Sequence, residues 1–291
     1  MENLRLVVVV TTDPSDLYFA NQLARRLGAV GVVVEDQQGS VTPLWRKVRK
    51  WGGKLLRVWE IPALMRDRKI VADHVLRSGA IDLAGFGEDG YGLQVPGSCR
   101  VIEAHGKDAV NAPATVRAVH DLAPDLVLLC GCSIVKAQLL SVPRLGTLNL
   151  HGGLAQRYRG VWTTLWAVVN REPEYVGATV HFVTPGIDDG DIVFQGRPEI
   201  EADDNPESLY VKVVKLGIEM MAAAVLEIAS GTVRRHRLEE KGKLYLTRMV
   251  TPQVLESAWR ATEEGVIPAY LADRQARDAG VVAVMRGPFP G

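Results

Sequence analysis

The sequence has little cysteine, no long run of apolar residues and no net charge. Three cysteines in 291 residues are too few for a disulfide framework, and they do not combine with histidines at zinc-binding spacing. No stretch approaches the roughly 20 apolar residues of a membrane span, and the N-terminus lacks the basic region of a signal peptide. We therefore expect a cytoplasmic protein with no membrane partner and no metal site.

The charge balance narrows the class of partner. The 34 Lys and Arg residues equal the 34 Asp and Glu residues in number, so we expect no nucleic-acid partner. The window 45–77 departs from this neutrality, with ten basic and three acidic residues. Trp45, Trp51 and Trp59 lie within it. The window is either a phosphate- or nucleotide-binding patch or a solvated helical face whose tryptophans turn toward the core.

Short β-branched runs alternate with helical segments in the first half of the chain. The run 4–10 is typical of a strand buried on both faces. A helix should begin at Pro14, with Asp13 as its cap, and end at Gly28. Further strands are expected over 29–34, 98–103, 126–129 and 146–150, with a helix over 112–122. This βα order predicts an α/β fold with a mostly parallel sheet and helices on both faces.

The second half predicts fewer strands and one long helix. We expect helices over 162–170 and 206–230, and strands near 176–183 and 191–195. A single helix near 252–264 is expected within a small appendage. The predicted division is a domain over 1–231, with halves 1–125 and 126–231, and a C-terminal extension over 232–291.

Residues 85–90, Gly-Phe-Gly-Glu-Asp-Gly, match the glycine pattern of dinucleotide-binding folds. In that pattern a helix opens after the glycines and its N-terminus binds a pyrophosphate. Here further glycines and a proline follow, and two acids, Glu88 and Asp89, lie inside the segment. We therefore expect a loop over 85–97 and no nicotinamide cofactor. The two acids and Tyr91 are instead candidates for contacts with a cationic amine.

The candidate catalytic residues lie between positions 149 and 188. Asn149 and His151 are two apart at the carboxyl end of a predicted parallel strand, so both side chains leave on the same side. Asp188 lies in a tight acidic loop between two predicted strands. Acyl transfer to an amine requires a donor to the oxyanion, a proton shuttle and a carboxylate that orients the imidazole. A histidine at a strand end or an Asp-Asp-Gly loop, taken alone, is more often structural than catalytic. The functional interpretation of these residues therefore depends on the order of the motifs along the chain.

These motifs resemble those of the folate-dependent formyltransferases, a family that includes glycinamide ribonucleotide transformylase, methionyl-tRNA formyltransferase and the sugar N-formyltransferases. The resemblance is close over about residues 98–200 and looser over the N-terminal units. The resemblance rests on four motifs: an Asn-x-His, a Tyr-x-Gly turn, a Gly-Ala-Thr-Val strand and an Asp-x-Gly loop. They are Asn149-Leu-His151, Tyr158-Arg-Gly160, Gly177-Ala-Thr-Val180 and Asp188-Asp-Gly190.

The resemblance implies a Rossmann-like formyltransferase fold and 10-formyltetrahydrofolate as co-substrate. Asn149 would donate to the formyl oxygen, His151 would stabilise the charge that develops there and help move the proton, and Asp188 would orient the imidazole and take a proton from the attacking amine through water. The half 126–231 would hold the folate and the catalytic residues, and the half 1–125 would form the acceptor side. Folate contacts are expected from Cys132, Ser133, Ile134, Val135, Thr184, Gly186 and Ile187.

Departures from the family pattern bear on the acceptor. The first turn, 11–14, carries an acid where the ribonucleotide enzymes have a glycine-rich phosphate loop. Fewer than about 50 residues follow Tyr245, where the tRNA enzymes continue with a barrel domain. The segment 152–155, Gly-Gly-Leu-Ala, replaces Ser-Leu-Leu-Pro and puts in doubt any role of that serine. We expect an amine or hydroxylamine of a small molecule, such as an amino sugar, a nucleotide sugar or a secondary-metabolite amine, and a homodimer as the assembly to test.

Two alternatives use the same fold. A formyltetrahydrofolate hydrolase would use the same three catalytic residues with water as the acceptor, although such enzymes carry a further N-terminal regulatory domain. A nucleotide-binding module would keep the fold without catalysis, although Asn149, His151 and Asp188 are all present.

Overall fold

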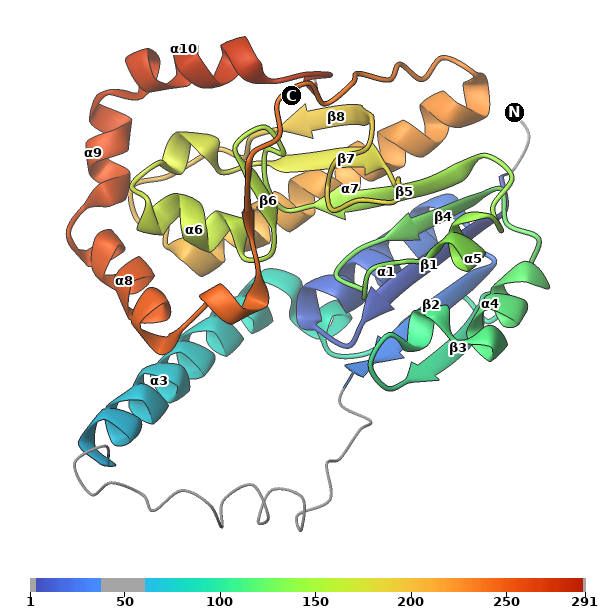
Figure 1. The fold of residues 1–291 in the computed structure, drawn as a ribbon, viewed down its shortest axis with the longest axis horizontal. Coiled ribbons are helices and arrows are strands. Elements are labelled where there is room, and N and C mark those ends of the chain that lie inside the picture. Colours follow the sequence, from blue (N-terminus) through green and yellow to red (C-terminus); the bar gives the residue numbers. More distant parts are fainter. Residues whose placement is uncertain (1–3, 38–60, 290–291) are drawn as a thin grey trace.

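The computed structural model describes residues 4–37 and 61–289 (Figure 1). The elements of the first half are β1 (Leu6–Thr11), α1 (Pro14–Leu27), β2 (Gly31–Asp36), α3 (Ile61–Phe86), η3 (Gly87–Gly90), β3 (Arg100–His105), η4 (Ala109–Asn111), α4 (Pro113–His120), β4 (Leu126–Leu129), α5 (Ala137–Leu140) and β5 (Gly146–His151). Those of the second half are β6 (Tyr158–Gly160), α6 (Thr163–Val169), η5 (Pro173–Tyr175), β7 (Ala178–Phe182), β8 (Ile192–Gly196), α7 (Pro206–Ser230), β9 (Lys243–Tyr245), η6 (Thr247–Met249), α8 (Pro252–Glu263), α9 (Val266–Ala272) and α10 (Arg274–Val284). None of the described helices is long and apolar enough to cross a membrane.

Seven strands form one sheet in the order β3-β2-β1-β4-β5-β7-β8. The strands from β3 to β5 are parallel to one another, whereas β7 and β8 run antiparallel to their neighbours. The predicted α/β fold with a mostly parallel sheet is therefore confirmed, and two antiparallel strands are added to it. The strand order reverses between β1 and β4, and open α/β sheets bind ligands beyond the strand ends at such a point.

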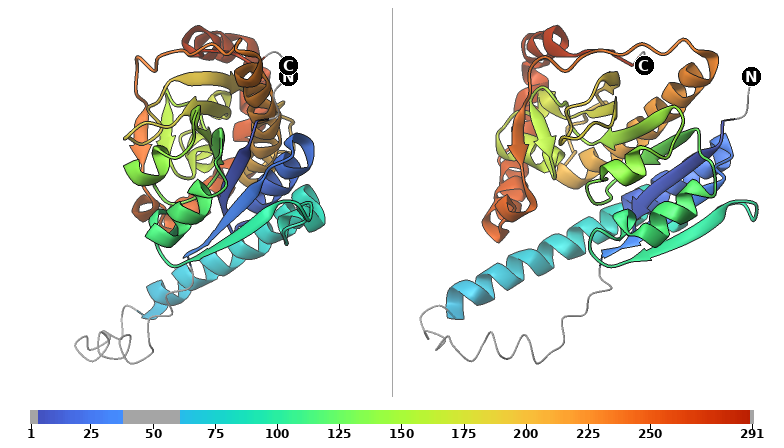
Figure 2. Two further views of the ribbon diagram at one scale, coloured as in Figure 1. Left: turned by 90° about the vertical axis from the view of Figure 1, so that its right-hand side faces the viewer. Right: turned by 45° about the vertical axis from the view of Figure 1, so that its right-hand side comes forward.

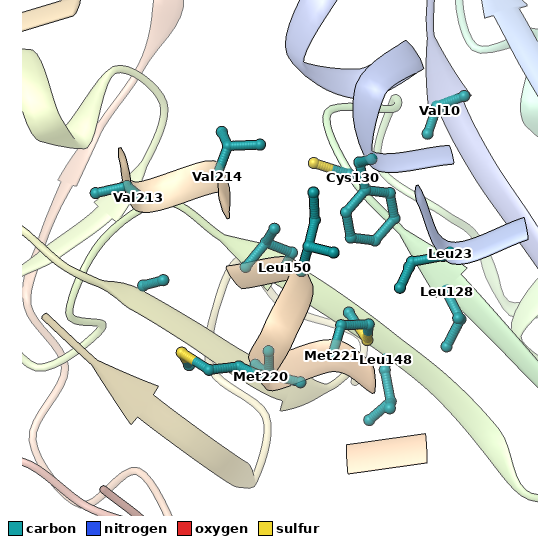
Figure 3. Close-up of a cluster of buried hydrophobic side chains, with 14 of the residues drawn as sticks. Val10, Leu23, Leu128, Cys130, Leu148, Leu150, Val213, Val214, Met220 and Met221 are labelled. Carbon is teal, nitrogen blue, oxygen red and sulfur yellow. The ribbon is translucent and has the colours of Figure 1, made fainter. Parts of the chain in front are cut away.

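Both faces of the sheet are covered by helices (Figures 1 and 2). Because alternate residues of a strand point to opposite faces, the valine run of β1 supplies two hydrophobic clusters. Val8 belongs to the cluster beneath α1 and α7, and Val7 to the cluster beneath α4 and α5. Figure 3 shows part of the first cluster, to which Leu148 and Leu150 of β5 and Met220 and Met221 of α7 contribute. Burial on both faces explains why the strand has no polar alternation.

Several local predictions were wrong. The expected loop over 85–97 begins inside a helix, since α3 continues to Phe86 and a 3₁₀ turn follows. Tyr158–Gly160 is a strand, β6, because it pairs in parallel with β9, more than 80 residues later in the chain. Asp13 occupies the cap position of α1 but its side chain makes no capping hydrogen bond, whereas Gly28 ends α1 in the left-handed conformation as predicted.

The basic window 45–77 is only partly described. Its tryptophans and residues 45–60 lie outside the described residues. On α3, Arg66, Arg68 and Lys69 are exposed to solvent, which agrees with a solvated helical face for that part of the window.

The C-terminal extension contains three helices rather than the single one expected, and they return onto the main domain. α8 packs against α3 and α6, as Figure 1 shows. Arg197, which follows β8, donates to Asp278 of α10 at 2.6 Å and to the hydroxyl of Tyr270 of α9 at 2.8 Å. The backbone N–H of Gln195 in β8 donates to the carbonyl of Gly287 at 2.7 Å. The end of the extension therefore covers the outer edge of the sheet, which would otherwise expose unpaired backbone groups.

A buried carboxylate joins the two strands at the point where the strand order reverses. Asp16 of α1 accepts hydrogen bonds from the Thr11 hydroxyl at 2.6 Å and the Thr11 backbone N–H at 3.2 Å. Gly131, directly after β4, packs against this carboxylate, and a Cβ at that position would lie 2.0 Å from Asp16 Oδ2. Gly131 also has a positive φ of 69°. Only glycine therefore permits this contact, which fixes the start of the loop after β4.

Gly131→Ala should destabilise the protein through two effects, the left-handed backbone and the collision with Asp16. Gly28→Ala is the matched control, because Gly28 also has a φ of 71° but nothing lies within 4 Å of its added Cβ. We expect the control to cost about 1–2 kcal/mol from backbone strain alone, and Gly131→Ala at least about 2 kcal/mol more. Equal losses in the free energy of unfolding, measured by urea denaturation, would contradict the close contact.

Asp16 should make stability depend on pH. Burial raises the pKa of Asp16 from 3.8 to about 6, so the folded state binds the proton more tightly than the unfolded state. The contribution of Asp16 to the free energy of unfolding should therefore decrease as the pH rises from about 4 to 6. The variant Asp16→Asn does not titrate at this position. The free energy of unfolding of wild type minus that of the variant should therefore be larger at pH 4 than at pH 7. If denaturation curves show the same difference in the free energy of unfolding from pH 4 to pH 7, the predicted contribution of Asp16 is wrong.

Candidate active site

Neighbouring antiparallel strands bring the first candidate residues together. Asn149 and His151 lie at the carboxyl end of β5. On β7, His181 lies opposite Asn149. Thr179 lies opposite His151 in the same register. Because alternate residues of paired strands share a face, all four side chains lie on one side of the sheet.

The His151 ring lies between two hydrogen-bond acceptors. Its Nε2 is 2.8 Å from the backbone carbonyl of Tyr158, which can only accept, so Nε2 carries a proton. Its Nδ1 lies 3.4 Å from Asp188 Oδ2. The ring is 4% exposed. Each ring nitrogen therefore faces one acceptor, the Tyr158 carbonyl on one side and the Asp188 carboxylate on the other.

Asp188 provides the negative charge of the cluster. Its Oδ2 accepts the backbone N–H of Gly160 at 2.7 Å, and its side chain is 11% exposed. Burial alone would raise the pKa of Asp188, but the charge of His151, the hydrogen bond and charge of His181 and the Gly160 N–H hold that pKa well below its ordinary value. Asp188 also has a positive φ of 47°, a strained backbone for a residue other than glycine. The carboxylate is therefore ionised throughout the neutral range.

His181 was not among the predicted site residues, yet it completes the cluster. Its Nδ1 is 2.9 Å from the carbonyl of Phe182 and therefore carries a proton. Its Nε2 lies 3.2 Å from Asn149 Nδ2 and 3.5 Å from Asp188 Oδ1. Asn149 and Asp188 thus approach the same nitrogen of this imidazole. The sequence feature that could have identified His181 is its position directly after the Gly-Ala-Thr-Val motif. It lies two residues beyond Thr179, on the same face of the strand.

Polar side chains fix the Tyr158 carbonyl that holds His151. The Tyr158 hydroxyl donates to Glu172 at 2.6 Å and accepts from Asn170 Nδ2 at 2.9 Å. Tyr158 itself is buried. Its ring and its backbone are therefore both restrained, which fixes the direction of the hydrogen bond from His151.

The Gly-Gly segment that departs from the family pattern packs closely around His151. A Cβ at Gly153 would lie 2.9 Å from His151 Nε2 and 2.9 Å from Thr163. The Gly153 carbonyl accepts from Thr179 Oγ1 at 2.6 Å, and the Gly152 carbonyl accepts from the hydroxyl of Thr163. The second glycine is thus required by the packing, and two threonines supply hydroxyl groups beside the segment.

The first predicted folate stretch, Cys132 to Val135, follows β4. The backbone N–H of Ser133 donates to Glu35 Oε2 at 2.8 Å, and Glu35 is fully buried at the end of β2. Asn111 Nδ2 donates to the carbonyl of Ile134 at 3.0 Å. The Ile134 side chain is 66% exposed. The loop is therefore anchored through its backbone from the protein side, while a large apolar side chain faces solvent.

Two of the predicted folate residues pack in the hydrophobic cluster beneath α4 and α5, and three others lie in the turn after β7. Val135 is buried in it, and Cys132 and Val183 pack against it. Burial raises the pKa of the Cys132 thiol, so it is not a reactive group. Thr184 is exposed and donates to Asp189 Oδ1 at 2.9 Å, and Gly186 and Ile187 follow in the same exposed to half-buried turn.

The Gly-rich segment before β3 does not offer two free carboxylates to a cationic amine. Asp89 is ion-paired with Arg25 and also accepts from Gln22 at 3.0 Å. The Tyr91 hydroxyl donates to the Gly79 carbonyl at 3.2 Å. Asp89 therefore has a structural partner already.

Comparison with known proteins identifies similar sequences and the same fold. Residues 97–225 match the family model described as formyl transferase. A methionyl-tRNA formyltransferase of Ruminiclostridium cellulolyticum is 28% identical over 158 residues, which cover 54% of this chain and 50% of that protein. The chain thus spans about half the length of such curated relatives.

Two solved structures show the same fold. A sugar N-formyltransferase from Shewanella is 14% identical, with a TM-score of 0.51, covering 89% of this chain and 87% of that one. An N-formyltransferase from Helicobacter canadensis, solved with folinic acid and dTDP-3-aminofucose, is 14% identical, with a TM-score of 0.51, covering 89% of this chain and 80% of that one. The matched range 97–225 includes the clustered Asn149, His151, His181 and Asp188. Residues 97–225 are therefore similar to the formyl transferase family, and the chain shares the fold of the two formyltransferase structures.

Proposed function

We propose that this protein transfers a formyl group from 10-formyltetrahydrofolate to an amine of a small-molecule acceptor, with Asn149, His151 and Asp188 as catalytic residues. One observation carries the proposal: a buried, ionised carboxylate lies between two imidazoles, with a carboxamide beside them. The match of residues 97–225 to the formyl transferase family model supports this class of reaction. The acceptor and the residue roles are the parts that require testing.

The chemistry follows from the groups present. The amine nitrogen attacks the formyl carbon, a new C–N bond forms, the bond from that carbon to the folate nitrogen breaks, and a proton passes from the amine to the leaving nitrogen. The Asn149 amide carries two N–H groups and has one neighbour, His181 Nε2 at 3.2 Å, so at least one N–H is available to the formyl oxygen as it gains negative charge. Both ring nitrogens of His151 lie beside protein acceptors, so the ring is held in one orientation next to the Asp188 carboxylate. Asp188 accepts the amine proton through water.

The loop after β4 suits the flat, largely apolar part of the folate. Glu35 and Asn111 fix its backbone, and the exposed Ile134 offers a surface that a ring system would cover. The backbone groups not used by these anchors remain for hydrogen bonds to the pterin. The turn from Thr184 to Asp188 would contact the same ligand near the catalytic carboxylate.

The aromatic residues near the candidate active site favour a small acceptor. Trp162, at the start of α6, and Trp259 of α8 both lie against the His74 ring, with ring centroids 5.7 Å and 6.4 Å apart. Helix α8 packs against both α3 and α6 beside these rings. The similar Helicobacter canadensis structure, solved with an amino-sugar nucleotide, agrees with a small acceptor, whereas the methionyl-tRNA formyltransferases among the relatives make tRNA the rival to test.

Substitution of the catalytic residues should nearly abolish transfer. Asn149→Ala removes the oxyanion donor and should lower kcat by about 10²–10³. His151→Ala and Asp188→Asn remove the imidazole and the base, and should each lower kcat by about 10²–10⁴. The measurement is mass spectrometry of an amine panel with 10-formyltetrahydrofolate, which detects the gain of one formyl group.

Asp189→Asn is the matched control for this prediction. Asp189 is the next residue along the loop, but it pairs with Lys241 at 2.9 Å rather than with a histidine. We expect transfer within a few-fold of wild type and unchanged thermal stability. Wild-type activity of Asp188→Asn would refute the assignment of Asp188, and folate breakdown at a rate that no amine or tRNA increases would indicate a hydrolase instead.

The folate site can be tested separately at Ile134. Ile134→Asp replaces an exposed apolar contact surface by a charge, so the KM for 10-formyltetrahydrofolate should rise by about tenfold or more with little change in stability. Leu226→Asp on α7 is the control, since Leu226 is a similarly exposed apolar residue outside the predicted folate stretches. If both variants show the wild-type KM for the folate, the loop does not bind it.

A further inference from the structure

Three side chains form a row across the last strands of the sheet, on the face that carries His151. His151 of β5 lies opposite Thr179 of β7, and Thr179 lies opposite Gln195 of β8. Because directly paired residues of neighbouring strands point to the same side, the three side chains share one face. Thr179 and Gln195 are completely buried. Two buried polar side chains thus lie between His151 and the outer strand of the sheet.

The C-terminal segment 284–289 continues this row beyond β8. The backbone N–H of Gln195 donates to the Gly287 carbonyl at 2.7 Å, and the Gln195 carbonyl accepts the Phe289 N–H at 2.7 Å. The side chain joins in, since Gln195 Oε1 accepts the Arg286 backbone N–H at 2.7 Å. A backbone N–H can only donate, so it fixes the oxygen of the carboxamide on the side of the C-terminal segment.

The hydrogen bonds that follow from this orientation all have one direction. Gln195 Nε2 donates to Gln156 Oε1 at 2.6 Å and to Thr179 Oγ1 at 3.0 Å. The Thr179 hydroxyl donates its one hydrogen to the Gly153 carbonyl at 2.6 Å. Gln156 Nε2 donates back to Gln195 Oε1 at 2.7 Å, so both N–H groups and both lone pairs of the Gln195 carboxamide are used. The order of donors therefore runs from the C-terminal segment to Gly153.

The row reaches the candidate active site at Gly153. The backbone there is packed against the imidazole, because a Cβ on Gly153 would lie 2.9 Å from His151 Nε2. The backbone N–H of Ala155 also points to Thr179 Oγ1, at 3.4 Å. Thr179 thus holds both ends of the short segment that packs against His151. Displacement of this segment would change the position of the ring, and small displacements of a reacting group are costly in rate.

We propose that Gln195 is a positioning residue for His151, and that docking of the C-terminal segment onto β8 sets the Gln195 carboxamide in its working orientation. Without the Arg286 N–H, the carboxamide can turn over, because Gln156 offers it both a donor and an acceptor. Thr179 would then face an oxygen and would direct its hydrogen to Gln195 instead of Gly153. The inference rests on the proposed function for the role of His151 in formyl transfer.

Two substitutions break the row at different points. Gln195→Met removes the carboxamide at nearly the same side-chain length. Gly287→Ala hinders docking, because Gly287 has a φ of 55° and its added Cβ would lie 2.5 Å from the Val193 carbonyl oxygen. Each should lower kcat at least about tenfold and change the KM for 10-formyltetrahydrofolate less than about twofold, measured with an amine that wild type formylates. The double variant should be no slower than the slower single variant, because both act through the same row.

Gly265→Ala is the matched control for the docking variant. Gly265 lies in the same extension and has a φ of 80°, but nothing lies within 4 Å of its added Cβ. This variant carries a similar backbone strain without a collision, so its thermal stability should fall while its kcat stays within about twofold of wild type. Wild-type kcat in Gln195→Met or Gly287→Ala, or additive losses in the double variant, would overturn the inference.

A second measurement does not depend on activity. The Nε2–H resonance of His151 is recorded by NMR in the full chain without substrate and is assigned by its loss in His151→Ala. Gln195→Met and Gly287→Ala should both shift this resonance, whereas Gly265→Ala should not. An unchanged resonance in the first two variants would overturn the inference while leaving formyl transfer intact. A shifted resonance, in a wild-type protein that formylates no amine or tRNA, would support the positioning role and refute the proposed function instead.

Discussion

A carboxylate with little access to water is stable only when positive charge and N–H donors surround it, and Asp188 imposes this requirement on the whole site. The imidazoles of His151 and His181 flank it, and the Gly160 N–H completes its coordination. These three groups come from β5, β7 and β6. The ends of three strands are therefore fixed relative to one another by one charge, and the positive φ of Asp188 is the local strain that this arrangement tolerates.

The same constraint explains why the two antiparallel strands matter. A parallel strand in the place of β7 would require a crossover connection. Because β7 is antiparallel to β5, His181 lies directly opposite Asn149. The chain then continues from β7 into the loop that contains Asp188. β6 is held in turn by β9, and a Cβ on Gly160 would lie 2.0 Å from the Tyr245 carbonyl. The extension therefore contributes a strand to the small sheet that presents Gly160 to Asp188. The extension therefore has two roles: it supports the strand that presents Gly160, and it covers the edge of the main sheet.

The sequence predicts most of what depends on local pattern. Valine-rich strands, the glycine stop of α1 and the long helix α7 follow from periodicity and end signals, and Asn149, His151 and Asp188 follow from motif order. What it does not predict depends on distant pairing. β6 is too short to be recognised without β9, and His181 in an apolar strand looks like a core residue until the register with β5 is known. Glu35 is similar, because its partner Ser133 lies 98 positions away.

Acidic side chains in this protein divide into two classes by environment. Asp188 has histidines and an N–H around it, so its pKa is lowered and its charge is permanent in the neutral range. Glu207 is almost as deeply buried but has no donor among the described residues, and its pKa is raised to about 7 by burial and by Asp82. The first carboxylate is stabilised by the protein itself and is suited to hold a charge during catalysis. The second has no such partner among the described residues, so it holds its proton more tightly than a solvated carboxylate does. Burial acts on both carboxylates, and their partners decide the direction in which each pKa moves.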